Sequence, residues 1–133
     1  MREIKFRGQR VDNKEWVYGG IFIPNSNSGK AVIYTYDPID KYSVYSETVG
    51  QYTGLKDKNG TEIYEGDIVH IILWDREGKP IIEEKAIVVF EHGKFGVHRG
   101  RESHLSSFDA FFNTTFEVIG NIHDNPELME GAK

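Results

Sequence analysis

The chain has 133 residues, a formal net charge of -5 at pH 7 and no cysteine. This length suits one domain or two small regions that share a core. The absence of cysteine excludes a disulfide framework and thiol chemistry, and the acidic balance disfavours a broad nucleic-acid-binding surface. The apolar run at residues 71–74 is too short to cross a membrane and the first residues contain no apolar signal core, so we expect a cytoplasmic protein.

Aromatic and β-branched residues are plentiful, which predicts a mainly β protein. An N-terminal β region is expected over residues 1–60, with strands near residues 3–7, 16–22, 31–36 and 42–45. Gly19 and Gly20 lie inside the second of these strands and indicate a bulge or a close backbone approach. Residues 24–30 contain no apolar side chain, and we predict a mobile surface loop there.

Residues 48–69 contain the densest turn chemistry in the chain and join the first β region to the second. The pair Asn59 and Gly60 predicts a β-hairpin with a type I′ turn, because that turn needs positive φ at both central residues. Gly66 marks a further position where the backbone is expected to adopt a conformation that side chains disfavour.

Residues 61–133 form the second predicted region. Strands are expected at residues 68–74, 81–90, 95–98 and 115–122, each followed by a turn. The economical arrangement for such strands is a small antiparallel barrel, because closure removes exposed edges. A polar cap followed by Pro126 then predicts a short C-terminal helical turn and tail.

The strands at residues 68–74 and 81–90 are apolar on both faces. A strand with one face in water should alternate between apolar and polar residues, so we expect one face to pack in the core and the other against another element or subunit. Register is needed to decide which face is which. The candidate outward or intersubunit positions are Ile68, Ile72, Trp74, Ile87 and Val89.

No set of residues in the sequence makes a convincing catalytic or metal site. His92, His98 and His104 are evenly spaced but lack the cysteine or carboxylate partners typical of zinc sites, and we interpret them as surface histidines. Glu83 and Glu84 are neighbours in one strand and should point to opposite faces, which makes them a poor catalytic pair. We therefore assign no catalytic, cofactor-binding or metal-binding residue, and we expect no cofactor and no enzymatic activity.

Nucleic-acid binding is the alternative function. Arg99 and Arg101 would contact phosphate from a small basic loop, and aromatic side chains on the barrel face would stack on bases. A second basic group occurs near the N-terminus, at Arg2, Lys5, Arg7 and Arg10. The negative charge of the whole chain favours the interpretation that these cations pair with the many acidic residues.

Three segments in a fixed order resemble the YopX family of bacteriophage and prophage proteins. They are residues 1–8 (MREIKFRG) with 16–19 (WVYG), residues 48–60 (TVGQYTGLKDKNG) with 63–69 (IYEGDIV), and residues 118–122 (VIGNI) with 125–128 (NPEL). The resemblance implies a small β-rich N-terminal part, an SH3-like barrel over residues 61–133 and a large homo-oligomer. It carries no catalytic residues.

These observations predict a phage- or prophage-encoded homo-oligomer that acts as an assembly or interaction module in the cytoplasm of a bacterial host. The expected partners are further copies of the chain and a host or phage protein, with no membrane association. Neither the residues nor the resemblance identifies a biochemical activity.

Overall fold

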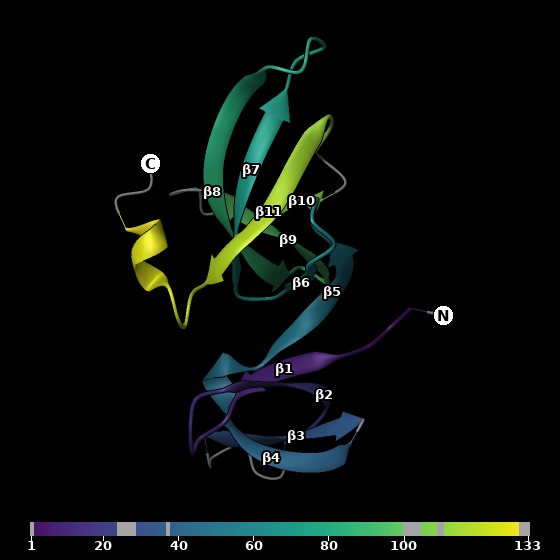
Figure 1. Cartoon of the computed structure of the whole chain (residues 1–133), viewed down its shortest axis with the longest axis vertical. Helices are drawn as coiled ribbons and strands as arrows, with labels where there is room; N and C mark the ends of the chain where they lie inside the picture. The colour runs from purple at the N-terminus through teal and green to yellow at the C-terminus, as the bar shows by residue number, and fades with distance from the viewer. Residues whose placement is uncertain (1, 24–28, 37, 100–104, 109–110, 131–133) are drawn as a thin grey trace. The chain divides into compact units, whose positions relative to one another are not determined.

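The computed structural model describes residues 2–23, 29–36, 38–99, 105–108 and 111–130. The chain divides into two compact units, Met1–Gly54 and Leu55–Lys133, whereas the sequence-based division lay after residue 60 (Figure 1). The protein is mainly β, as predicted, and contains two antiparallel sheets. Positions 24–28 of the predicted mobile loop lie outside the described residues.

The first sheet has the strand order β4-β3-β2-β1-β5-β6. An isolated bridge also joins Arg10 to Val44, so the sheet curls from the end of β1 toward β4. A short 3₁₀ turn, η1 (Ser46–Thr48), precedes β5. The strands are β1 (Phe6–Gln9), β2 (Trp16–Phe22), β3 (Lys30–Tyr36), β4 (Ile39–Tyr45), β5 (Gly50–Lys56) and β6 (Glu62–Tyr64).

The core of the first unit lies on one face of β3 and β4. Ala31 and Ile33 are buried together with Val44, and partly buried side chains from β1 and β2 pack against them. The alternate residues Tyr34 and Tyr36 point away from this core and are exposed. The pattern is the period-2 alternation of a strand with one covered face.

Gly19 is the point of closest backbone approach in the first sheet, as the sequence predicted for the glycine pair. A Cβ atom at this position would lie 1.8 Å from the carbonyl oxygen of Tyr34. Gly8 similarly faces the side chain of Val44, at 2.8 Å from a Cβ built on it. The two glycines therefore allow β1, β2, β3 and β4 to pack closely around a small core.

The second sheet has the strand order β10-β9-β8-β7-β11. Within the described residues β10 and β11 end this order and do not pair with each other, so closure into an SH3-like barrel is not confirmed. The predicted C-terminal helical turn is present as η3 (Pro126–Met129). No helix in the described part of the chain is long and apolar enough to cross a membrane. The strands are β7 (Asp67–Trp74), β8 (Pro80–Glu91), β9 (Lys94–Arg99), β10 (Ser106–Ser107) and β11 (Thr114–Asn121).

The register decides which face of β7 and β8 is the core. Val69 pairs with Ala86. These two residues are buried in the core of the second unit, which also contains Ile71, Val88 and Val97. Partly buried phenylalanines from β11 and the segment before it cover this cluster. We call this side of the sheet the inner face and the opposite side the outer face.

The five candidate interface residues lie on the outer face, but they are not equally accessible. Ile68 is fully buried within the unit. Its partner in β11 is Gly120, and a Cβ at Gly120 would lie 2.9 Å from Leu128 of η3. The C-terminal turn therefore covers this end of the outer face, which accounts for part of the second apolar surface. The other four residues are half-buried, and their role in self-association stays a prediction: Ile72, Trp74, Ile87 and Val89.

Replacing Gly120 with valine should displace η3 from the outer face. The new side chain would occupy the space of the Asn125 and Leu128 side chains, and overpacking of this kind costs about 2 kcal/mol. Denaturant unfolding should show the loss, and amide hydrogen exchange at Leu128 should accelerate. The neighbouring exposed residue supplies the control, Ile119→Val, which should change neither quantity; unchanged exchange in Gly120→Val would contradict the assigned packing.

The turn after β5 differs from the predicted type I′ hairpin. Positive φ occurs at Gly60, at +82°, but not at Asn59. The Asp57 carboxylate instead organises the turn, because its Oδ1 accepts hydrogen bonds from the N–H groups of Asn59 (2.8 Å) and Thr61 (2.9 Å). An aspartate that binds backbone groups two and four residues later favours a type I turn closed by a left-handed glycine.

Candidate functional site

The described part of the second unit contains a groove of about 460 Å³ on the inner face of its sheet. Apolar side chains form most of its lining. They come from β7 (Ile71, Leu73), β8 (Ile82) and the segment before β11 (Phe111, Phe112). A volume and lining of this kind are typical of small-molecule sites.

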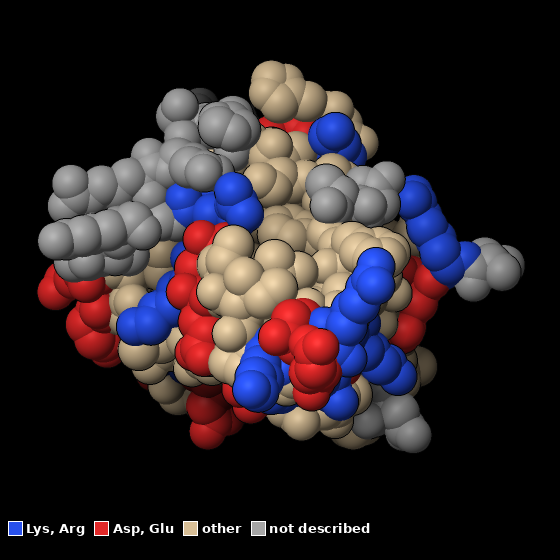
Figure 2. All heavy atoms as spheres, turned by 90° about the horizontal axis from the view of Figure 1, so that it is seen from above, with Lys and Arg blue, Asp and Glu red and all other residues tan. Residues whose placement is uncertain are grey.

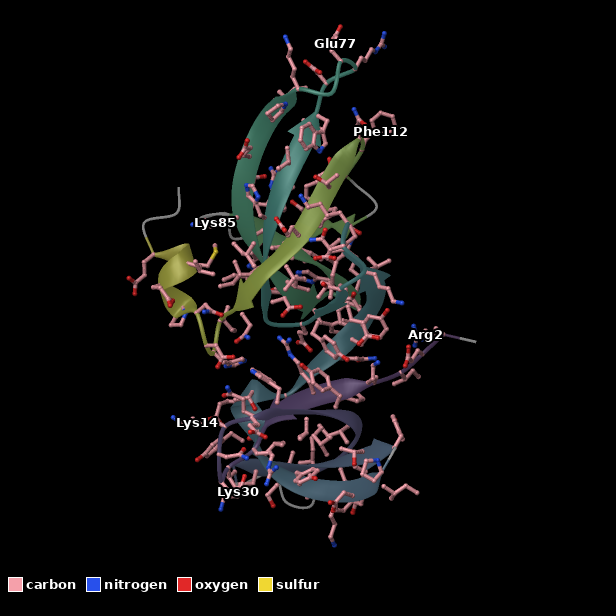
Figure 3. All side chains as sticks on the ribbon, in the orientation of Figure 1. Arg2, Lys14, Lys30, Glu77, Lys85 and Phe112 are labelled. Carbon is pink, nitrogen blue, oxygen red and sulfur yellow. The ribbon has the colours of Figure 1, made fainter. Side chains whose placement is uncertain are left out.

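The groove lies beyond the filled part of the core. Leu73 and Ile82 are paired across β7 and β8, close to the turn that joins the two strands. Phe112, labelled in Figure 3, lies just before β11 and is 86% exposed. No described element covers these residues as fully as the core residues are covered, and they remain accessible to a ligand.

One ion pair lies among the apolar walls of the groove. Arg99 Nη1 is 3.1 Å from Glu84 Oε1, and the Arg99 guanidinium lies 5.8 Å from the centre of the Phe111 ring. The side chains of Arg99 and Glu84 are 33% and 26% exposed, so both keep part of their polar surface accessible. Glu83 lies on the outer face instead, 3.4 Å from His70 Nε2, as the alternation of the strand predicts.

Several of the described cations considered for nucleic-acid binding have partners within the chain. Arg99 pairs with Glu84, and Arg101 lies outside the described residues. Near the N-terminus, Arg7 is buried and its guanidinium lies 4.6 Å from the Trp16 ring centre. In the view of Figure 2, positive and negative side chains are interspersed and form no surface of a single sign.

The pairing of Arg10 with Asp12 changes the pKa of both groups. Its Nε and Nη2 donate to the two carboxylate oxygens of Asp12, at 2.9 and 2.7 Å. This bidentate hydrogen bond lowers the pKa of Asp12 and raises the pKa of Arg10. Both groups are therefore held in their charged forms, and the pair adds no net positive charge to the surface.

Two of the three evenly spaced histidines lie in the described part of the chain. His98 Nε2 lies 2.9 Å from Glu91 Oε1, His92 is exposed in the β8–β9 turn, and His104 lies outside the described residues. No group of three or more His, Asp or Glu side chains suited to a metal ion occurs among the described residues.

The sequence analysis did not identify an exposed aromatic surface in the first unit. The side chains point away from the core on β2, β3 and the start of β4, and we call this surface the aromatic face: Tyr18, Phe22, Tyr34, Tyr36 and Ile39. The alternation of β3 could have revealed this surface. Ala31 and Ile33 are buried on one face, so the alternate residues Tyr34 and Tyr36 must lie on the opposite face.

Comparison with protein-family models matches residues 5–130 to the family described as YopX protein. The chain belongs to the YopX family. This agrees with the resemblance found in the sequence segments and extends it over almost the whole chain.

Two similar proteins can be compared directly. The SPbeta prophage-derived uncharacterized protein YopX of Bacillus subtilis (strain 168) is 35% identical over 77 residues, which cover 56% of this chain and 54% of that protein. The chain thus matches about half the length of its curated relative. The crystal structure of protein EF1440 from Enterococcus faecalis aligns with a TM-score of 0.58 and 25% identity, over 98% of this chain and 100% of that one.

The YopX sequence segments have structural roles in the second unit. In the turn between β6 and β7, the buried Asp67 carboxylate accepts a hydrogen bond from the Tyr64 N–H at 2.7 Å. Gly66 has φ of +92°, and its N–H donates to the Val88 carbonyl at 2.8 Å. This turn therefore connects β6 to β7 and is hydrogen-bonded to β8, with backbone geometry that glycine favours.

The last YopX segment closes the end of β11. Asn121 Oδ1 accepts hydrogen bonds from the N–H groups of His123 and Asp124, at 2.9 and 2.8 Å. The Asn125 N–H donates to the Asn121 carbonyl at 2.8 Å, immediately before Pro126 begins η3. These residues direct the C-terminal turn onto Gly120. The spacing of the last YopX segment is therefore explained by its role in folding.

Proposed function

We propose that this YopX-family chain is a prophage-encoded interaction module that self-associates through the aromatic face of its first unit. The prophage origin of the Bacillus subtilis relative supports the genetic context. The cysteine-free sequence supports action in the cytoplasm of a bacterial host.

Exposure of the aromatic face is the observation that carries this proposal. Tyr36 and Ile39 are Cα partners on β3 and β4 and are 61% and 85% exposed. Tyr34 and Phe22 add further exposed aromatic surface, at 43% and 54%. Contiguous apolar surface of this kind marks interaction sites, and tyrosine and phenylalanine are enriched in interface cores.

The negative net charge of the chain favours self-association through this surface over association through an acidic one. Each copy carries a formal charge of -5, so contacts between acidic surfaces are disfavoured. The five residues that define the aromatic face are uncharged, with Lys41 opposite Tyr34 as a neighbouring charge, and a symmetric contact would bury the aromatic residues against each other. The outer face of the second unit is more charged, because Ile72 lies beside Glu83 and His70.

Light scattering on a sizing column tests the proposal with two matched variants. The wild-type chain should elute as an oligomer. The double variant Tyr34→Glu, Tyr36→Glu should elute as a monomer, and its circular dichroism spectrum should show that it is folded. Ile72→Lys, on the surface suggested by the sequence alone, should leave the oligomer intact. A monomeric wild type at high concentration, or dissociation by Ile72→Lys only, would overturn the assignment.

Nucleic-acid binding is the second candidate, because exposed aromatic residues on a sheet can stack on bases. This function would require affinity that falls steeply with salt. The absorbance ratio of the same column peak, followed by a salt titration with single-stranded DNA and RNA, separates it from self-association. Self-association alone predicts a peak free of nucleic acid and no binding at low salt.

A further inference from the structure

The conformation of the turn after β5 does not explain the pair Asn59–Gly60. It is the only Asn–Gly pair in the chain, yet positive φ occurs at Gly60 and not at Asn59. The Asp57 carboxylate holds the turn through the backbone N–H groups of residues 59 and 61, and any residue except proline supplies such a group. The side chain of Asn59 therefore needs a separate explanation.

An asparagine that precedes a glycine can react with its own backbone. The backbone nitrogen of Gly60 loses its proton to water and attacks the side-chain carbonyl carbon, Cγ, of Asn59, so that a Cγ–N bond forms. The bond from Cγ to Nδ2 breaks, and this nitrogen takes up a proton and leaves as ammonia. Water then opens the resulting succinimide ring at either carbonyl, which gives aspartate or isoaspartate. Glycine favours the attack because it has no Cβ to obstruct the approach of the two groups.

The closed turn holds both reacting groups away from this reaction. The Gly60 N–H donates to the Asp57 carbonyl oxygen at 3.0 Å. The Asn59 Nδ2 group donates to Glu117 Oε2 of β11 at 3.2 Å. Attack requires the Gly60 nitrogen to lose its proton and the Asn59 side chain to rotate toward it, so both hydrogen bonds must open first. Asn59 and Gly60 are exposed, and water for the last step reaches them directly.

The product of the reaction does not fit the closed turn. A carboxylate at position 59 cannot donate to Glu117, and it places a second negative charge beside that side chain. Lys58 Nζ lies 3.8 Å from Glu117 Oε1 and is exposed, so it offsets only part of this repulsion. Isoaspartate also adds a carbon atom to the backbone between the two N–H groups that Asp57 Oδ1 binds. The turn therefore loses its fit to Asp57 and to β11.

We propose that Asn59 is a modification site of this chain, which deamidates without an enzyme when the turn at residues 57–61 opens. The hydrogen bonds of Asp57 and Glu117 keep the site unreacted while the turn is closed. Deamidation then hinders the turn from closing again on β11, so each event loosens the second unit irreversibly. The site does not depend on self-association, since all of its residues belong to the second unit.

Timed incubation of the full chain at mildly alkaline pH, followed by peptide mapping with mass spectrometry, measures the reaction at each asparagine. Asn59 should accumulate both aspartate and isoaspartate. Asn13 is the internal reference, because it is also exposed but precedes Lys14, whose side chain obstructs the attack. The products should accumulate faster at Asn59 than at Asn13.

Two substitutions that open the turn test the protection. Asp57→Asn should speed deamidation at Asn59 about tenfold or more, because the open fraction of the turn rises as hydrogen bonds are lost. Glu117→Ala releases only the Asn59 side chain from a partly exposed contact, and it should speed the reaction about threefold. The matched control is Asp75→Asn, which alters the β7–β8 turn and should leave the rate at Asn59 unchanged.

Two substitutions at position 59 separate the added charge from the lost donor. Asn59→Asp reproduces one product, and hydrogen exchange of the Val118 amide, which donates to Asp57 Oδ2, should speed up about tenfold. Asn59→Ala removes the donor to Glu117 without adding a charge, and it should speed this exchange by about threefold or less. Nuclear magnetic resonance measures the exchange in both variants.

Each step has an outcome that overturns it. A rate at Asn59 no higher than that at Asn13 in the wild-type chain would remove the proposed site. An unchanged rate in both Asp57→Asn and Glu117→Ala would show that the closed turn does not protect Asn59. Equal Val118 exchange in Asn59→Asp and the wild type would show that the product still fits the closed turn.

Discussion

Replacing Asp57 with asparagine should lower the free energy of unfolding of the second unit by about 2–3 kcal/mol, as expected for lost hydrogen bonds to a buried charged group. Asp57 Oδ1 holds the turn through Asn59 and Thr61, and Oδ2 accepts the Val118 N–H of β11 at 2.8 Å. Asparagine has a single acceptor oxygen, so it can serve the turn or β11 but not both. Thermal unfolding by calorimetry measures the loss.

The turn at Asp75 supplies the matched control. Its Oδ1 accepts hydrogen bonds from the N–H groups of Glu77 and Lys79, at 2.9 and 2.8 Å, and Gly78 has φ of +81°. Glu77 marks the tip of this β7–β8 hairpin in Figure 3. Both bonds use the same oxygen, so Asp75→Asn can keep them and should cost about 0.5 kcal/mol or less. Equal losses at Asp57 and Asp75 would contradict the role assigned to the Val118 bond.

The same carboxylate makes stability depend on pH. Burial opposes ionisation of Asp57, but hydrogen bonds from the Val118, Thr61 and Asn59 N–H groups, together with the charge of Lys58, outweigh it and lower the pKa of Asp57. A lowered folded-state pKa contributes stability above the unfolded value of about 3.9, and this contribution is lost as the pH falls through the folded value. The wild type should therefore lose stability more steeply than Asp57→Asn below about pH 4.

Replacing Gly19 with alanine should destabilise the first unit by about 3 kcal/mol or more, at the upper end of overpacking effects. The new Cβ would lie 1.8 Å from the Tyr34 carbonyl oxygen. That oxygen belongs to the backbone of β3, so it can move only if the strand moves. Denaturant unfolding followed by circular dichroism measures the loss, and exchange of the Ile33 amide should report local opening of β3.

Gly20→Ala is the control for this substitution. The nearest atom to a Cβ at Gly20 is the Tyr36 Oη at 3.7 Å, which is an ordinary van der Waals distance. The added methyl group also restricts the unfolded chain, so the variant should be neutral or more stable by about 0.5 kcal/mol. Similar destabilisation by both substitutions would indicate that flexibility, rather than close approach, is what the glycine pair provides.

The aromatic face and the groove lie in different units and would serve different roles. The aromatic face has apolar area and few charges, which suits contact with another protein surface. The groove has a defined volume and mostly apolar walls, which is typical of small-molecule sites.

Local features could be predicted from the order of amino acids. Alternation in residues 68–74 predicted that Val69 and Ile71 share one face and Ile68 and Ile72 the other, and the structure confirms it. The glycine pair predicted the close approach at Gly19, and Pro126 predicted a short C-terminal turn. These features depend on backbone sterics and on a period of two residues, which act over a few positions.

Which surfaces are covered, and which side chains meet, depended on the tertiary structure. Alternation is symmetric, so it could not show that Ile68 is buried by η3 or that Tyr34 is left exposed. Glu84 and Arg99 meet only through the register of β8 and β9, and the bond from Val118 to Asp57 joins residues 61 positions apart. The same Asp57 carboxylate organises the turn after β5. It holds this turn in a different conformation from the type I′ turn that the Asn59–Gly60 pair alone predicted.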